Sequence, residues 1–204
     1  MPKIVVFTQR VEIVESYGER RDCADQRISK FLTKCGFIPI PLPNDSIVAR
    51  EIIESIEPCG IVLTGGNSLV KYGGNAPEKD LVDKTLIALS IEKRIPLLGF
   101  CRGMESIFDY FNVNLEKIDG HIATKHEIFD NKGNKLIVNS YHNYACKHNS
   151  CLDIDSLYKS KDGVIEMMQH KDYPIIGLMW HPEREIHYST KDIKIFKDLF
   201  GGKR

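Results

Sequence analysis

The sequence predicts an α/β fold with a mostly parallel central sheet flanked by helices and a smaller antiparallel sheet. Two patterns predict it. Through the first hundred residues, short apolar runs alternate with amphipathic stretches, which is typical of parallel strands covered by helices. After residue 112, strand-sized runs follow one another around turn-forming tetrads, which indicates antiparallel pairing. We find no repeat, linker or low-complexity segment, so we expect residues 1–204 to form a single domain.

The first strand is expected at residues 3–7, a short apolar run. A helix is expected at residues 20–35, where apolar residues recur at helical spacing, and Gly36 favours its end. The next strand, residues 37–42, contains two prolines that cannot donate to a neighbouring strand. We therefore expect it at the edge of the sheet.

Two further helix and strand pairs follow. A short amphipathic helix is expected at residues 47–56 and a buried strand at residues 60–64, where every position but the first and last is branched and apolar. A long helix at residues 77–94 has leucine and valine on its inward face. The apolar run at residues 96–100 is the next strand, which completes a β-α-β-α-β-α-β series.

The second half begins with a helix expected at residues 102–112. A hairpin at residues 127–138 is predicted around an Asn-Lys-Gly-Asn turn. Strands are expected at residues 164–169 and 175–180, with a proline-containing turn between them. An amphipathic helix at residues 190–200 ends the fold.

Composition argues against polymeric partners. The 204 residues carry 28 Lys and Arg against 28 Asp and Glu, and no extended basic run occurs. Binding to nucleic acid or to an acidic membrane surface depends on such basic charge, so neither is expected. The apolar runs are far shorter than the roughly 20 residues that span a bilayer, and the N-terminal run is too short for a secretion signal. We expect a cytoplasmic protein.

The six cysteines are expected to be free thiols, because a chain of this length can bury a core without disulfides. Cys146, His148 and Cys151 form the one crowded patch that suggests zinc. It lacks a fourth ligand and a matching second half, so we predict no metal site.

The strongest local motif is Gly99-Phe100-Cys101-Arg102-Gly103, at the transition from an expected strand to an expected helix. This arrangement is typical of a nucleophile elbow with cysteine in place of serine. The two glycines permit a sharp turn, and the N-terminus of the following helix is expected to lower the pKa of the thiol. The alternative is a buried structural cysteine.

A thiol nucleophile needs a base, and His181 is the best placed of the seven histidines. It follows the expected strand that ends at Trp180, so it should lie at the same sheet edge as Cys101. Glu183, two residues later, can orient the imidazole, which makes a Cys-His-Glu triad plausible. The alternative is an ordinary turn with a hydrogen-bonded histidine.

The glycine pair Gly65-Gly66 follows a strand and can expose backbone N–H groups, as an oxyanion hole requires. The second donor is expected to be the N–H of Arg102, directly after the nucleophile. A glycine pair alone is weak evidence, since most such pairs are simply loops.

The three motifs together, Leu-Thr-Gly-Gly-Asn at 63–67, Gly-Phe-Cys-Arg-Gly at 99–103 and Met-Trp-His-Pro-Glu at 179–183, resemble the class I glutamine amidotransferases. Within them the chain is most similar to the free-standing γ-glutamyl hydrolase branch. The resemblance extends over nearly the whole chain. It implies no cofactor and a small-molecule γ-glutamyl substrate, and it assigns these roles: Cys101 as nucleophile, His181 as base and acid, Glu183 as its orienting group, and the N–H groups of Gly66 and Arg102 as oxyanion donors.

The resemblance also suggests substrate-binding positions. Glu105 stands where the family usually has glutamine, a departure that favours the hydrolase branch. The expected substrate-binding residues beside it are Gly65, Asn67, Ser140, Tyr141 and His142. Where the branch commonly has Arg-Asp-x-x-Glu, this chain has Lys-Asp-Leu-Val-Asp at residues 79–83, so the role of that segment stays open.

A narrower likeness lies at residues 8–10, 16–22 and 125–127. These segments resemble the small bacterial γ-glutamyl-CDP-amidate hydrolases of capsule phosphoramidate synthesis. Arg10, Arg20 and the adjacent Arg21 could then contact a nucleotide pyrophosphate through bidentate hydrogen bonds. The alternative is that these arginines are solvated or paired with acidic neighbours.

The sequence thus predicts a cysteine-dependent hydrolase that releases glutamate through a γ-glutamyl thioester. One alternative is a glutaminase subunit that delivers ammonia to a separate synthase, a partner needed only under that hypothesis. Another is a binding protein that has lost catalysis. A homodimer is compatible with the sequence, which shows no apolar stripe that requires one.

Overall fold

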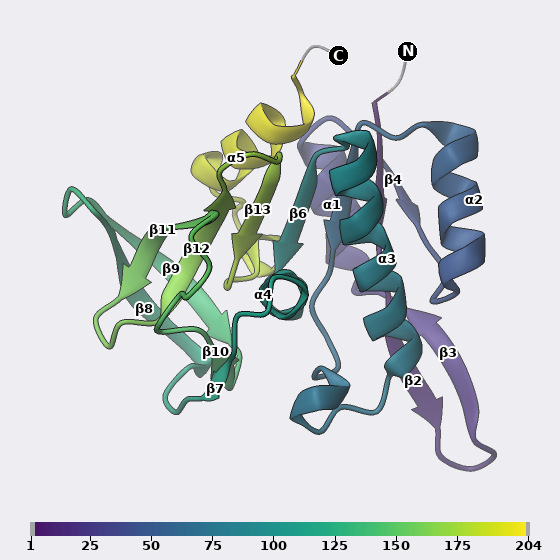
Figure 1. The fold of residues 1–204 in the computed structure, drawn as a ribbon, viewed down its shortest axis with the longest axis horizontal. Coiled ribbons are helices and arrows are strands. Elements are labelled where there is room, and N and C mark those ends of the chain that lie inside the picture. Colours follow the sequence, from purple (N-terminus) through teal and green to yellow (C-terminus); the bar gives the residue numbers. More distant parts are fainter. Residues whose placement is uncertain (1–2, 203–204) are drawn as a thin grey trace.

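The computed structural model describes residues 3–202, and its central element is a nine-stranded mixed sheet with the order β4-β1-β5-β6-β13-β12-β11-β8-β9. The first five strands in this order are parallel, and the other four continue the sheet in antiparallel fashion (Figure 1). The strand bounds are β1 Ile4–Phe7, β4 Ile38–Pro41, β5 Gly60–Leu63, β6 Leu97–Phe100, β8 Ile122–Asp130, β9 Lys135–Tyr141, β11 Ile154–Ser160, β12 Ile165–His170 and β13 Ile175–Leu178.

Helices cover both faces of the parallel half of the sheet. Buried side chains of α2, α3 and α4 belong to one apolar core, and those of α1 and α5 belong to a second core on the opposite face. Each core packs against the alternate side chains of the same strands, as expected for buried parallel strands. The helix bounds are α1 Gln26–Lys34, α2 Ser46–Ile56, α3 Pro77–Lys93, α4 Arg102–Tyr110 and α5 Thr190–Phe200, with short 3₁₀ turns η1 Val70–Tyr72 and η2 Pro182–Arg184.

Three helices begin at side-chain caps that the sequence supplies. Asp25, Asp45 and Ser189 accept hydrogen bonds from the first backbone N–H groups of α1, α2 and α5. Such caps satisfy amides that have no partner within the helix. They set the positions at which these helices start.

Two small antiparallel sheets accompany the large one. The hairpin of β2 (Arg10–Val14) and β3 (Glu19–Cys23) projects from the main body (Figure 1). The second pairs β7 (Glu116–Lys117) with β10 (Tyr144–Ala145). The predicted α/β architecture, with its mostly parallel sheet and smaller antiparallel sheets, is thus confirmed, as is the edge position of the proline-containing strand β4.

The expected helix at residues 20–35 is wrong in its first part. Residues 19–23 form strand β3, paired with β2, and the helix begins only after the Asp25 cap. Cross-strand pairing therefore overrides the helical spacing of the few apolar residues in this stretch. The hairpin of β8 and β9 is also longer than predicted, and strands β2, β7, β10 and β11 were not expected.

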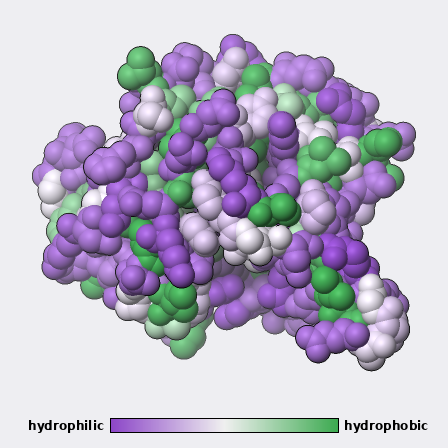
Figure 2. All heavy atoms as spheres, turned by 60° about the horizontal axis from the view of Figure 1, so that its bottom comes forward, coloured by the Kyte–Doolittle hydropathy of each residue, from purple (hydrophilic) through white to green (hydrophobic). Residues whose placement is uncertain are grey.

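The carboxyl ends of the parallel strands β1, β5, β6 and β13 share one edge of the sheet. Figure 2 views the molecule with this edge turned forward; its surface is mostly hydrophilic, and a lobe at the lower right corresponds to the β2–β3 hairpin of Figure 1. In open α/β sheets, ligands bind at this edge. None of the helices formed by residues 3–202 is long and apolar enough to cross a membrane.

Candidate active site

Cys101 lies at the carboxyl end of β6 in a backbone conformation that non-glycine residues rarely adopt, with φ 51° and ψ −116°. Two glycines make this turn possible. A Cβ on Gly103 would lie 2.1 Å from the carbonyl oxygen of Leu63, and a Cβ on Gly99 would lie 2.5 Å from the carbonyl carbon of Gly103. The strained turn is the geometry of a nucleophile elbow, and it places the N–H of Arg102 in the first turn of α4, where no helical partner exists.

His181 and Glu183 form a buried pair just beyond β13. The Nδ1 of His181 lies 2.8 Å from an Oε1 of Glu183, and both residues are 2% exposed. A carboxylate at this distance accepts a hydrogen bond from the Nδ1–H group and leaves Nε2 free to act as a base.

Asn139, on β9, holds the backbone of His181 on both sides, a contact that the sequence analysis missed. Its Oδ1 accepts from the His181 N–H at 2.9 Å, and its Nδ2 donates to the His181 carbonyl at 2.8 Å. Asn139 lies 42 residues away in sequence, and no local motif marks it. The side chain thus fixes the backbone of His181 from β9, which lies at the far edge of the sheet.

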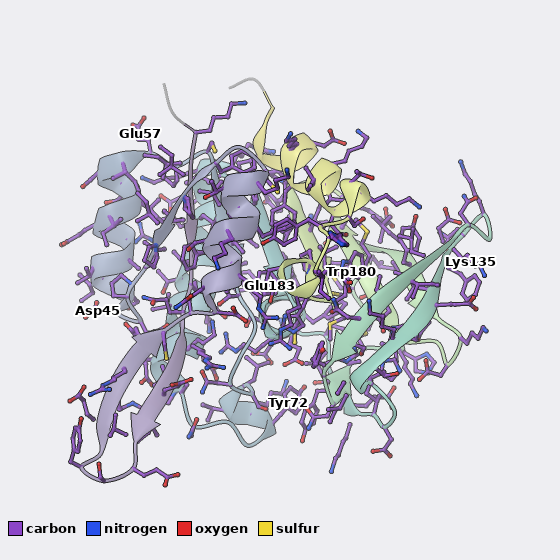
Figure 3. The ribbon with its side chains drawn as sticks, turned by 180° about the vertical axis from the view of Figure 1, so that it is seen from behind. Asp45, Glu57, Tyr72, Lys135, Trp180 and Glu183 are labelled. Atoms are coloured by element: carbon purple, nitrogen blue, oxygen red, sulfur yellow. The ribbon has the colours of Figure 1, made fainter. Side chains whose placement is uncertain are left out.

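Trp180 anchors the same segment to α5. Its indole N–H donates to a carboxylate oxygen of Asp192 at 3.1 Å, and both side chains are buried. Figure 3 shows Trp180 and Glu183 near the centre of the molecule, below the end of α5 in that view. His181 is therefore held by contacts to a strand on one side and a helix on the other.

Gly65 brings the nucleophile and the base together. A Cβ built on it would lie 3.5 Å from the Cβ of Cys101 and 2.8 Å from the Cε1 of His181. Both side chains thus face one point on the loop after β5. Gly66, with φ 94°, follows in a conformation that exposes backbone and favours glycine.

The pocket beside this pair is lined by Arg10 and Arg184 together with the glycine pair and His181. The ring of Tyr141 lies 5.6 Å from that of His181 at nearly a right angle, and the guanidinium of Arg184 lies 4.4 Å from the centre of the Tyr141 ring. Two cationic side chains and one aromatic ring therefore surround the reacting groups.

The pKa of the Cys101 thiol is raised, which is contrary to the expectation from the helix N-terminus. Burial raises it most, the negative charge of Glu105 adds to the rise, and the N–H of Arg102 acts in the opposite direction. The resting side chain is therefore a thiol, and attack on a substrate would require a base to take up its proton. Burial also raises the pKa of Glu105 to about 7, against an opposing effect of Arg102.

The side chain of Arg102 anchors the elbow to α3, a role that was not predicted. It forms buried ion pairs with Asp80 and Asp83. Asp83 also lies 3.5 Å from the ammonium group of Lys79, which donates to the hydroxyl of Thr8 at 3.2 Å. Burial lowers the pKa of Lys79 well below its ordinary value, so the ion pairs of Arg102 with Asp80 and Asp83 are the contacts by which the segment at residues 79–83 holds the first turn of α4.

Two of the expected binding residues serve instead to position the hairpin. The side chain of Asn67 exchanges two hydrogen bonds with the backbone of Val11, at 2.8 and 2.9 Å. Arg20 pairs with Glu78 and donates to the carbonyl of Asn75, so its guanidinium is engaged away from the pocket. Arg10 lines the pocket, and its guanidinium pairs with the exposed carboxylate of Glu12 on the same strand.

The side chains of Ser140 and His142 point to the opposite face of the chain from Tyr141, whose ring contacts His181. The hydroxyl of Ser140 donates to the carbonyl of His121 at 2.7 Å, and the fully buried ring of His142 faces Glu166. Cys146 and Cys151 are free cysteines. Within residues 3–202, the group of side chains that could hold a metal ion is a different one, which contains His121, His126 and Glu166.

Comparison with known proteins assigns the family. The model of the glutamine amidotransferase class-I family matches residues 20–200. The chain therefore belongs to the class-I glutamine amidotransferases.

Two curated relatives and one solved structure illustrate the similarity. A γ-glutamyl-CDP-amidate hydrolase of Campylobacter jejuni is 37% identical over 95% of this chain and 96% of its own length. A γ-glutamyl-γ-aminobutyrate hydrolase of Escherichia coli O157:H7 is 25% identical over 91% of this chain and 86% of its own length. The crystal structure of a glutamine amidotransferase from Thermotoga maritima superimposes with a TM-score of 0.69 and 16% identity, covering 98% of this chain and 83% of that one.

Proposed function

We propose that this protein hydrolyses γ-glutamyl amides through a Cys101 thioester. The observation that carries the proposal is the position of Gly65, against which both the Cys101 elbow and the His181–Glu183 pair are packed. A thiol, a base with an orienting carboxylate and exposed backbone amides at one point are the parts that acyl transfer requires.

In the first half-reaction, Nε2 of His181 takes the thiol proton as the Cys101 sulfur attacks the γ-carbonyl carbon. The oxygen of the tetrahedral intermediate accepts hydrogen bonds from the N–H groups of Gly66 and Arg102. When the intermediate collapses, the C–N bond breaks and His181 returns the proton to the leaving nitrogen. A γ-glutamyl thioester remains on Cys101.

In the second half-reaction, His181 takes a proton from water, which attacks the thioester carbonyl. The same amides stabilise the new oxyanion, and glutamate leaves as the sulfur recovers its proton. Glu183 stabilises the imidazolium in both halves, because its carboxylate accepts a hydrogen bond from the Nδ1–H group.

We further propose a nucleoside diphosphoramidate as the leaving part of the substrate, as in γ-glutamyl-CDP-amidate of capsule phosphoramidate synthesis. The C. jejuni relative bears that name and shares the length of this chain. Arg10 and Arg184 line the pocket beside the reacting groups, where phosphate oxygens could accept their hydrogen bonds. Tyr141 offers a ring beside them, and we assign Gly65 and Glu105 to the glutamyl end.

The test is glutamate release by the purified chain alone. γ-Glutamyl-CDP-amidate, a γ-glutamyl alkylamide and L-glutamine are compared at equal concentration. Cys101→Ala is the inactive variant, and Cys151→Ala is the matched control because Cys151 is a free cysteine elsewhere in the fold. We expect turnover of the nucleotide conjugate to exceed that of glutamine and to be lost only in Cys101→Ala.

Two results would contradict the proposal. Turnover that persists in Cys101→Ala would exclude the thioester. Turnover of glutamine alone, or only after a synthase is added, would instead support the glutaminase-subunit alternative.

A further inference from the structure

Three histidines surround one buried carboxylate in the antiparallel half of the sheet. Glu166, on β12, is fully buried, and its Oε1 faces all three rings: Nε2 of His126 at 3.1 Å, Nδ1 of His121 at 3.4 Å and Nε2 of His142 at 3.7 Å. The three ring nitrogens and both oxygens of Glu166 have no hydrogen-bond partner within the described residues. Buried polar atoms without partners are costly and call for an explanation.

The outer nitrogens of two rings show which way their protons point. Nδ1 of His142 lies 3.2 Å from the carbonyl oxygen of Tyr144, and Nε2 of His121 lies 3.2 Å from a carboxylate oxygen of Asp162. A carbonyl or an ionised carboxylate only accepts hydrogen bonds, so these outer nitrogens carry the protons. In a neutral ring the inner nitrogen is then a lone pair, directed at the carboxylate of Glu166.

Lone pairs facing a carboxylate repel it unless a cation lies between them. Protonating all three rings would supply positive charge, but the ring centres of His121 lie only 4.6 Å from His126 and 4.9 Å from His142. Three imidazolium ions at that spacing would repel one another. A single divalent cation would satisfy the inner nitrogens of His121 and His126 and the carboxylate at once, since these ligand atoms lie within 4.8 Å of one another.

The distances fit a tetrahedral metal site. Zinc bonds of 2.0–2.1 Å to nitrogen and oxygen place adjacent ligand atoms about 3.3 Å apart in a tetrahedron. The separations of His126 and His121 from the Glu166 oxygen, 3.1 and 3.4 Å, lie on either side of this value. The outer carboxylate and carbonyl contacts are also those that orient histidine ligands of metal ions.

We propose that His121, His126 and Glu166 bind one Zn²⁺ ion, with His142 facing the same carboxylate. The three ligand atoms lie within 4.8 Å of one another, and His121 and Glu166 are less than 6% exposed. The ion would tie β8 and the residue before it to β12. These strands support the segment that carries His181, since the backbone carbonyl of Glu166 accepts from the N–H of Met179 at 2.8 Å.

The experiment measures zinc binding in a Cys101→Ser background, because the Cys101–His181 pair is itself able to hold zinc. The full chain is stripped with a chelator and titrated with Zn²⁺ against a competing indicator. Co²⁺ is then substituted to record its visible spectrum. We expect one equivalent of Zn²⁺ per chain, a rise in Tm on addition, and the intense visible absorption of tetrahedral Co²⁺.

Two ligand variants and two controls locate the site. Glu166→Gln and His126→Gln are expected to weaken zinc binding by at least about tenfold. His187→Gln, which alters an exposed histidine, and Cys146→Ser, which disrupts the cysteine patch, should bind as the background does. Absence of stoichiometric zinc in the background protein would overturn the proposal whether or not either variant folds. Equal binding by Glu166→Gln would overturn it as well.

Discussion

Replacing Glu105 by glutamine should remove a buried charge beside the nucleophile. Glu105 is 5% exposed and follows Cys101 by one helical turn in α4. Glutamine keeps the shape of the side chain and cannot ionise. The substitution therefore isolates the effect of charge on stability and on the thiol.

The pKa of Glu105 gives the magnitude. Burial raises it from the ordinary 4.5 to about 7. A raised carboxyl pKa means that the folded state holds its proton when the unfolded state has lost it. The favourable contribution of Glu105 to the free energy of unfolding is therefore present below pH 4.5 and is lost as the pH rises toward 7. The total loss is roughly 3 kcal/mol.

Urea unfolding at pH 5 and pH 8 measures this effect. We expect the free energy of unfolding of Glu105→Gln, measured relative to the wild type, to be roughly 2 kcal/mol higher at pH 8 than at pH 5. The difference is smaller than the full loss of roughly 3 kcal/mol because the wild type has already lost part of its stability at pH 5. Glu51→Gln, which alters an exposed carboxylate of α2, is the matched control and should show no such change.

Alkylation of Cys101 by iodoacetamide gives a second readout. The charge of Glu105 raises the pKa of the thiol, so its removal should move the pH profile of alkylation to lower pH. A stability difference that does not change between pH 5 and pH 8, together with an unshifted alkylation profile, would refute the reasoning.

Three other substitutions test the rest of the site. Gly65→Ala should lower kcat about 100-fold with little change in secondary structure by circular dichroism, because its Cβ would displace the ring of His181; full activity would contradict the packing at Gly65. Asp83→Asn should lower stability in urea by about 3–5 kcal/mol, because it leaves the buried Arg102 guanidinium poorly paired; a loss below 1 kcal/mol would mean that the ion pair is not closed in solution. Arg10→Gln should raise KM about tenfold for the nucleotide conjugate and leave KM for a γ-glutamyl alkylamide unchanged; an equal rise for both would assign Arg10 to the glutamyl end.

Several features were accessible from the sequence because they depend on nearby residues. The glycine spacing around Cys101 predicts the elbow, and the structure has the residue in that turn. Prolines predict the edge strand, since the missing N–H acts at the residue itself. The pairing of His181 with Glu183 also spans only two residues, and the observed contact matches the prediction.

Other features depend on residues far apart in the chain and could not be predicted. Helical spacing at residues 20–35 gave way to the β2–β3 hairpin, because strand pairing is decided by the partner strand. The Asn139 clamp on His181 and the anchoring of Arg102 by Asp80 and Asp83 join residues that no local pattern relates. Ser140 and His142 were expected to contact the substrate. Their side chains instead contact His121 and Glu166, because alternate residues of a strand point to opposite faces of the sheet.

The sequence by itself determined the alternation of the parallel strands and helices in the first half, the strained position of the cysteine and the pairing of His181 with Glu183, because these follow from local backbone chemistry. Tertiary structure alone decided the charge environment. The thiol pKa is raised because folding buries Cys101 and brings Glu105 beside it, an effect that outweighs the helix N-terminus. The histidines around Glu166 likewise come from β8, the residue before it and the residue after β9, and only the folded sheet brings their ring nitrogens to one carboxylate on β12.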